Sequence, residues 1–206
     1  MAIEPKSLPF DKELVGISKQ TIDAHYEKLY KGYVNKRNEI GPMLGQTFLD
    51  QSTSELDRAN QTYSHLRALR KAETFAMNGT FLHERYFECL GGNGEPAGEL
   101  VDALAKKFGS LETFIKYFSA SAMAMRGWAV LAWNTFEGKI NVIGCDSHDS
   151  GAVWGFIPII VLDVYEHAYF IDYGTDRKSY IEAFWNNFNW EKANSIYNQV
   201  KEIKII

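Results

Sequence analysis

The chain has 206 residues, of which 46% are hydrophobic and 23% are charged, a composition typical of a globular protein. The formal net charge of -4 argues against a nucleic-acid-binding protein, and no apolar run approaches the roughly 20 residues of a membrane span. Cys89 and Cys145 fit no disulfide framework or paired metal spacing, and the N-terminus lacks a signal-peptide pattern, so we expect a cytoplasmic protein with reduced thiols.

The first half of the chain predicts two long helices that pack as an antiparallel hairpin. The first helix is expected to begin near Ser18, which is a good N-cap residue. His25, Leu29 and Tyr33 follow at intervals of four residues and therefore share one face of this helix. Glycine and proline within residues 38–42 predict that the helix ends or bends there.

The second long helix is expected over residues 63–90, and it carries another inward-facing histidine. Gly79, His83 and Phe87 are spaced by four residues, so His83 lies on the apolar face beside a glycine. Glycine inside a helix costs about 1 kcal/mol relative to alanine, which suggests that another group approaches closely there. The hairpin would place His25 on one arm and His83 on the other, although a single histidine on an apolar face is more often part of the core.

The second half of the chain has a different pattern. Glycine and proline cluster at residues 91–96 and mark a boundary, so we expect an N-terminal helical hairpin domain at 1–92 and a C-terminal α/β domain at 93–206. The C-terminal half predicts helices at about 97–108, 111–125, 178–187 and 190–203, and strands at 128–133, 140–143 and 156–162. The predicted fold class is α+β, an antiparallel helical hairpin followed by a three-stranded antiparallel sheet with surrounding helices.

The end of the third strand carries a carboxylate and an imidazole four residues apart. Asp163 would leave the strand end and His167 would stand on the first turn of a following helix, so that both side chains point to one place. A metal site needs this arrangement, but Asp163 could also be a helix cap and His167 a core histidine. His148 precedes the strand in a polar loop, and His65 is expected to be a solvated surface residue. Three imidazoles and one carboxylate without a thiolate would favour iron, manganese or zinc.

Residues 163–169 have the sequence Asp-Val-Tyr-Glu-His-Ala-Tyr, which resembles the DVWEHAY signature of the iron/manganese superoxide dismutase family. The resemblance extends over nearly the whole chain, including residues 21–35, Gly127-Trp128 and residues 180–190. It implies one Fe or Mn ion per subunit, with iron or dual use favoured, and disproportionation of superoxide to oxygen and hydrogen peroxide. The implied metal ligands are His25, His83, Asp163 and His167.

The resemblance also implies roles for residues around the ligands. Tyr33 matches the tyrosine that guards the substrate channel and joins a hydrogen-bond relay. Trp128 would form a wall of the pocket, although plain core packing explains it equally well. Glu166 matches a residue that reaches across a two-fold interface to the partner's ligand histidine, equivalent to His167, which predicts a homodimer, possibly a tetramer.

Several positions depart from the family pattern. The usual glutamine beside the metal-bound solvent comes from one of two positions, which here are Gly79 and His148, so we hypothesise that His148 hydrogen-bonds that solvent. Leu29 and Phe170 replace two polar residues that meet across the dimer interface, and exchanging both partners for apolar groups can be nearly neutral. Tyr165 replaces the signature tryptophan and would slightly open the pocket.

The sequence also allows two alternatives to a superoxide dismutase. One is a non-enzymatic relative that keeps the fold for binding or structure, and the other is a metalloenzyme that uses the site for peroxide or other oxygen chemistry. Because superoxide is an anion and the chain is acidic, a local basic rim is expected, with Lys28, Lys31 and Arg177 as candidates.

Overall fold

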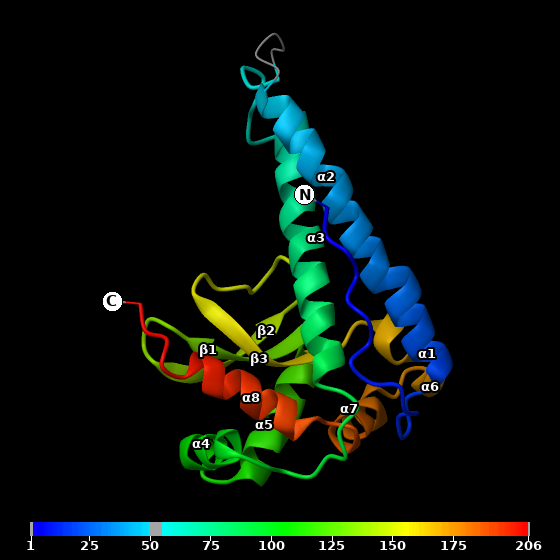
Figure 1. The fold of residues 1–206 in the computed structure, drawn as a ribbon, viewed down its shortest axis with the longest axis vertical. Coiled ribbons are helices and arrows are strands. Elements are labelled where there is room, and N and C mark those ends of the chain that lie inside the picture. The colour runs from blue at the N-terminus through cyan, green and yellow to red at the C-terminus, as the bar shows by residue number, and fades with distance from the viewer. Residues whose placement is uncertain (1, 50–54, 206) are drawn as a thin grey trace.

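The computed structural model describes residues 2–49 and 55–205, and its elements confirm the predicted α+β fold (Figure 1). The helices are α1 (Lys19–Ala24), α2 (Lys31–Leu49), α3 (His65–Glu88), α4 (Glu99–Phe108), α5 (Leu111–Ala124), α6 (Phe170–Tyr173), α7 (Arg177–Asn186) and α8 (Trp190–Val200). A π-helix, η1 (His25–Tyr30), joins α1 to α2, and a short 3-10 helix, η2 (Glu166–Ala168), follows the last strand. The strands are β1 (Trp128–Asn134), β2 (Lys139–Cys145) and β3 (Phe156–Asp163).

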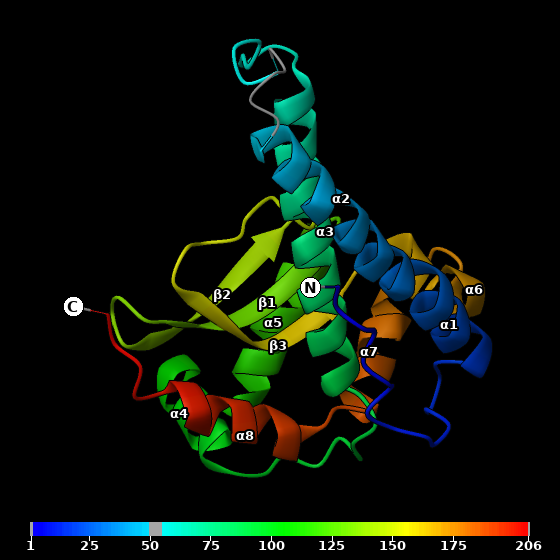
Figure 2. The same ribbon diagram turned by 45° about the horizontal axis from the view of Figure 1, so that its top comes forward.

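Helices α2 and α3 lie side by side and extend well beyond the rest of the molecule in both views (Figure 1 and Figure 2). The sequence predicted that the helix ends or bends at residues 38–42, and it does not end there, because α2 continues through Pro42 to Leu49. Ile40 and Leu44, on either side of the proline, are buried against α3. This packing outweighs the hydrogen bond that a proline removes from a helix.

The first helix contains an irregularity that its sequence pattern does not reveal. Ser18 caps α1 by accepting a hydrogen bond from the backbone N–H of Thr21, as its position predicts. The buried positions that follow include His25, Tyr30 and Val34, and the five-residue step from His25 to Tyr30 coincides with η1. Such π turns are often found at functional sites. The extra residue in the turn lets two side chains five positions apart face the same side of the helix.

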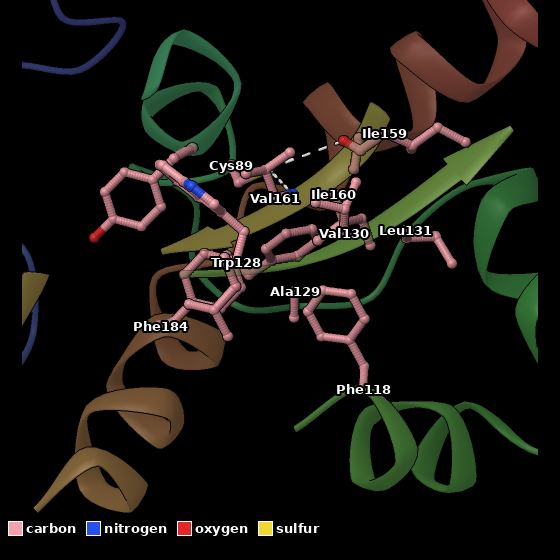
Figure 3. Packing of buried hydrophobic residues seen from close by; sticks show 14 of the residues in the cluster. Cys89, Phe118, Trp128, Ala129, Val130, Leu131, Ile159, Ile160, Val161 and Phe184 are labelled. Atoms are coloured by element: carbon pink, nitrogen blue, oxygen red, sulfur yellow. Dashed lines mark hydrogen bonds between the residues drawn. The ribbon is translucent and has the colours of Figure 1, made fainter. Parts of the chain in front are cut away.

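The sheet has the order β2-β1-β3, with both pairs antiparallel, and its central strand β1 is buried along its whole length. Helix α5 packs against β1 and β2, whereas α3 and α8 contact β3. Figure 3 shows the core at this point, where the thiol of Cys89 lies against the backbone of Ile159 and Val161. The register pairs Trp128 with Asp163, so the end of β3 lies beside the start of β1.

The segment between α3 and α4 packs against the link between α7 and α8. The backbone N–H of Gly92 donates to the carbonyl of Asn187, and a Cβ atom on Gly92 would lie 2.1 Å from the carbonyl oxygen of Phe188. This close contact explains why residue 92 is a glycine.

The division of the chain into domains at 1–92 and 93–206 remains a proposal. Within the described residues, no helix combines the length and the apolarity that a membrane crossing requires.

Candidate metal centre

Four side chains from four different elements converge at the base of the helical hairpin. His25 opens η1, His83 lies on α3, Asp163 ends β3 and His167 lies on η2. One donor atom from each lies within 4.8 Å of every other. The first three side chains are fully buried, whereas that of His167 is 25% exposed. The structure therefore brings together residues that are separated by up to 142 positions in the chain.

The spacing of the donor atoms matches a single ion. Oδ2 of Asp163 lies 3.2 Å from Nε2 of His25, 3.1 Å from Nε2 of His167 and 3.6 Å from Nε2 of His83. Nitrogen and oxygen ligands bind a metal such as zinc at about 2.0–2.2 Å, which separates neighbouring ligands by roughly 3–4 Å. The four donors therefore surround a space of the size that one first-row metal ion needs.

The ring of His83 is oriented for binding through Nε2. Its Nδ1–H donates to the backbone carbonyl of Gly79 at 2.5 Å, which leaves the lone pair on Nε2. That Nε2 atom is buried and has no hydrogen-bond partner among the described residues. A buried polar atom without a partner is costly, and a metal ion among the four donors would satisfy it. The site thus fits a metal in the orientation of its ligands as well as in their spacing.

The charges at the site also suit a cation. Burial would raise the pKa of Asp163, but His167 and His25 lower it further than burial raises it, so the carboxylate stays charged. Burial lowers the pKa of His25 and His83, which keeps these rings in the neutral form that binds metals. Oδ1 of Asp163 accepts the backbone N–H of Tyr165 at 3.0 Å, and Oδ2 is left to face the histidines. Nitrogen and oxygen donors without a thiolate favour iron, manganese or zinc.

His148 is buried beside the four donors although it belongs to a polar loop. Its Nδ1 accepts the indole N–H of Trp128 at 2.9 Å, and its ring centroid lies 5.7 Å from that of His83. Burial lowers the pKa of His148 to about 4, so the ring is neutral at neutral pH. Because Nδ1 accepts, the single hydrogen of the neutral ring must lie on Nε2. Trp128 itself packs edge-on against His83, with centroids 5.0 Å apart, and so contributes both to the core and to the site.

Gly79 makes room for two of these rings. A Cβ atom at this position would lie 2.9 Å from the ring of Tyr33 and 3.2 Å from that of His148. The close approach predicted at Gly79 is therefore confirmed. Tyr33 lies between the site and the surface, with its ring centroid 5.2 Å from that of His83 and 4.6 Å from that of His148.

The remaining candidates differ in how close they lie to the donors. His65 is exposed at the start of α3 and faces Glu55, which confirms its surface location. Glu166 is exposed on η2, next to His167. Tyr165 stacks on the ring of His167 with centroids 5.2 Å apart and so covers one side of this ligand. That Tyr165 slightly opens the pocket relative to a tryptophan stays a prediction.

Two backbone groups also orient the ligands, and the sequence did not predict them. They are the carbonyl of Gly79 and the N–H of Tyr165. The sequence does contain a pattern for each, because a helical carbonyl lies within reach of a side chain four residues later and aspartate often bonds the N–H two residues on. Neither pattern shows by itself which ring nitrogen or carboxylate oxygen is left free.

Comparison with known proteins identifies the family. The model of the alpha-hairpin domain of iron/manganese superoxide dismutases matches residues 6–91, and the model of their C-terminal domain matches residues 96–196. The chain belongs to the iron/manganese superoxide dismutase family. Both matched regions contribute to the centre, since His25 and His83 lie in the first and Asp163 and His167 in the second.

Individual superoxide dismutases are similar over almost the full chain. Iron superoxide dismutases of Aquifex pyrophilus and Aquifex aeolicus are each 42% identical over 199 residues, which cover 96% of this chain and 92% of theirs. A manganese superoxide dismutase of Halobacterium salinarum is 32% identical over 201 residues, which cover 95% of this chain and 94% of its own. Enzymes named for either metal are thus among the relatives.

Proposed function

We propose that the protein is a superoxide dismutase, which converts superoxide into dioxygen and hydrogen peroxide and acts as an antioxidant. The observation that carries this proposal is the convergence of three imidazole nitrogens and one carboxylate oxygen in a chain of this family. The proposed ligands of a single Fe or Mn ion are His25, His83, Asp163 and His167. We favour iron or dual use, since both of the 42% identical relatives are named as iron enzymes.

When bound, the ion supplies the redox chemistry, passing between its trivalent and divalent states as one superoxide is oxidised and a second is reduced. The protein contributes the charge balance around it. Asp163 is held as an anion by His167 and His25, and an anionic ligand stabilises the trivalent state. The neutral rings of His25 and His83 add no further charge.

The reaction also consumes two protons for each peroxide formed, and we assign their handling to Tyr33 and His148. Burial, with a further contribution from Asp163, raises the pKa of Tyr33, so its hydroxyl keeps its hydrogen at neutral pH. The bond from Trp128 fixes the His148 ring with its hydrogen on Nε2. Two neutral donors therefore lie against the ring of His83, where they can deliver a proton or hydrogen-bond a solvent molecule.

A surface cavity of about 580 Å³ on the hairpin offers superoxide a route to Tyr33. Its lining includes the three lysines Lys28, Lys36 and Lys71 together with Asp149, which gives it a net positive charge. Of the expected rim residues, only Lys28 lines this cavity. Lys31 pairs with Glu27, and Arg177 donates to the carbonyl of Met125. Lys36 lines the cavity but pairs with Glu39, so we propose Lys28 and Lys71 as the basic rim.

We further propose a homodimer formed around Glu166. This carboxylate is exposed beside the partly exposed His167, so it is free to reach the ligand histidine of a second copy. Phe170 and Ile171 lie four and five residues after Glu166 and are 53% and 48% exposed, which leaves apolar surface on the same segment of the chain. A dimer through this face would bury the apolar surface and shield both centres from bulk water.

We also propose a cytoplasmic location, because both cysteines are unpaired and buried, as expected in a reducing compartment.

The experiment that tests the function is an assay of superoxide removal by the purified protein, loaded separately with iron and with manganese and analysed for metal content. Activity that scales with bound metal supports the proposal. Negligible activity at full loading with each metal would overturn it.

A further inference from the structure

Two buried tyrosine hydroxyls are linked to the backbone carbonyl of Asp163, one directly and the other through the first. The hydroxyl oxygen of Tyr180, on α7, lies 2.7 Å from the carbonyl oxygen of Asp163 and 3.1 Å from the hydroxyl oxygen of Tyr86, on α3. Both tyrosines are fully buried. Neither hydroxyl takes part in the metal or proton chemistry assigned above.

The chemistry of the groups fixes the direction of these bonds. A carbonyl oxygen can only accept, so the O–H of Tyr180 must donate to Asp163. That bond uses the single hydrogen of Tyr180, and the O–H of Tyr86 must then donate to the oxygen of Tyr180. The bonds form a chain from Tyr86 through Tyr180 to Asp163, and bonds in such a chain strengthen one another. Burial raises the pKa of both tyrosines, so each keeps its hydrogen.

The two tyrosines contact three of the four proposed ligands or the elements that carry them. Tyr86 follows His83 by three residues on α3, and its ring lies against that of His25, with centroids 5.1 Å apart. Asp163 is the last residue of β3, where the strand ladder ends and the backbone turns towards η2. The hydrogen bond from Tyr180 to this carbonyl therefore fixes the position of the end of β3.

We propose that Tyr180 and Tyr86 are positioning residues of the metal centre, which hold the end of β3 at the distance from α3 that Oδ2 of Asp163 needs to share an ion with the histidines. This inference rests on the proposed metal site. It also gives α7, which supplies no ligand, a direct part in setting the affinity of the site.

The test compares two tyrosine-to-phenylalanine variants by their affinity for manganous ion, measured on apoprotein with a competing chelator. Tyr180→Phe keeps the buried ring and removes only the hydroxyl. We expect affinity to fall about 10–100-fold, as is typical when a group that supports a metal ligand is removed. Tyr197→Phe is the control, because Tyr197 is a half-buried tyrosine on α8 that packs against Trp133. The affinity of this variant for manganous ion should equal that of the wild-type protein. Equal affinities in the two variants would overturn the proposal.

A second measurement separates positioning from general stability. Metal that binds only the folded protein raises its melting temperature by an amount set by affinity. If Tyr180 positions the ligand, Tyr180→Phe will narrow the gap between the melting temperatures of apoprotein and metal-loaded protein. A purely structural role would lower both temperatures together and leave the gap unchanged, and that result would also overturn the proposal.

Tyr86→Phe keeps the inference testable if Tyr180→Phe fails to fold. This variant keeps the bond from Tyr180 to Asp163 and removes the Tyr86 hydroxyl that donates to Tyr180, so we expect a smaller loss of manganous-ion affinity. No loss of affinity would contradict the proposed role of Tyr86. Where the double variant folds, it should bind as weakly as Tyr180→Phe alone, because Tyr86 acts through Tyr180. Wild-type protein that binds metal but removes no superoxide would defeat the proposed function and leave this affinity test intact.

Discussion

At the scale of single residues, Gly79 decides whether Tyr33 and His148 can both approach the centre. Alanine at this position would gain about 1 kcal/mol of helix propensity. Its Cβ atom would lie 2.9 Å from the ring of Tyr33, however, and such overpacking costs about 1–3 kcal/mol. We therefore expect Gly79→Ala to displace Tyr33 and to lower activity per bound metal several-fold, as measured by a steady-state superoxide assay with metal analysis.

Gly45→Ala provides the matched control, since Gly45 is a helical glycine of α2 with no other atom within 4 Å of the added Cβ position. This variant should gain stability and keep its activity. If Gly79→Ala behaves in the same way as Gly45→Ala, the room beside Tyr33 has no functional importance.

His148 yields a second prediction at this scale. His148→Ala removes the proposed donor and also the acceptor for the indole N–H of Trp128. We expect turnover to fall by about 100-fold or more, the usual contribution of a positioned acid–base group, while the metal content stays unchanged. His148→Gln should recover part of this loss, because an amide can accept from Trp128 and still donate. A His148→Ala protein with full activity and full metal loading would rule out the proposed role.

At the scale of elements, Asn187 connects the segment before α1 to the end of α7. Its amide donates to the carbonyls of Val15 and Ala183 at 2.7 and 2.8 Å, and its side-chain oxygen accepts the backbone N–H of Val15 at 2.8 Å. Asn187→Ala removes the partner of the Val15 N–H and carbonyl, whereas the Ala183 carbonyl still accepts the main-chain N–H of position 187. We therefore expect a loss of about 1–3 kcal/mol in the free energy of unfolding. Urea denaturation measures it, with the exposed Asn198→Ala as control. Equal midpoints for the two variants would contradict this account.

Several features of the helices and strands could be predicted from the sequence alone. Ser18 accepts a backbone N–H at the start of α1, as predicted, because helix capping is local chemistry that is visible in the sequence. The three strands were predicted because apolar runs bounded by glycine behave similarly in most folds. The π turn was not predicted, because Leu29 and Tyr30 are both apolar and either could continue the pattern.

Tertiary packing explains most of the remaining differences. Helix α2 passes through Pro42 because Ile40 and Leu44 pack on α3, which a local rule for proline cannot anticipate. The local pattern placed His148 in a polar loop, and only the family resemblance suggested that it lies beside the metal-bound solvent. Its burial involves a tertiary contact with the indole of Trp128 on β1. The four candidate ligands could be named from the sequence only through the family resemblance, since helical spacing alone also allowed His25 and His83 to be core residues.

At the scale of the whole molecule, the basic cavity should make the reaction sensitive to salt. Lys28→Glu with Lys71→Glu reverses two charges that line it. We expect kcat/KM for superoxide to fall several-fold at low ionic strength, because the field that steers an anion is weakened. The difference from wild type should shrink at about 1 M salt, where the screening length is only about 3 Å.

The control for steering is Lys106→Glu with Lys116→Glu, which makes the same change in net charge on α4 and α5. This variant should retain most of the wild-type rate at every salt concentration. An equal loss of rate in the two double variants would show that only net charge matters.

The proposed dimer gives a further prediction at this scale. Phe170→Lys places a charge on the apolar surface beside Glu166, so it should shift the protein from dimer to monomer in light scattering and reduce activity. Phe136→Lys is a matched control, since Phe136 is also 53% exposed but lies beside Gly155 in the C-terminal region. A dimer that resists Phe170→Lys but dissociates with Phe136→Lys would place the interface elsewhere.

The central claim is that His25, His83, Asp163 and His167 bind one redox-active ion that removes superoxide. The most direct test measures superoxide removal per bound metal in wild-type protein and in Asp163→Asn, each loaded with iron and with manganese. The account predicts rapid removal by wild type with at least one metal, and a large loss of activity when the anionic ligand becomes neutral. Full metal content without activity in wild type, or full activity in Asp163→Asn, would contradict it.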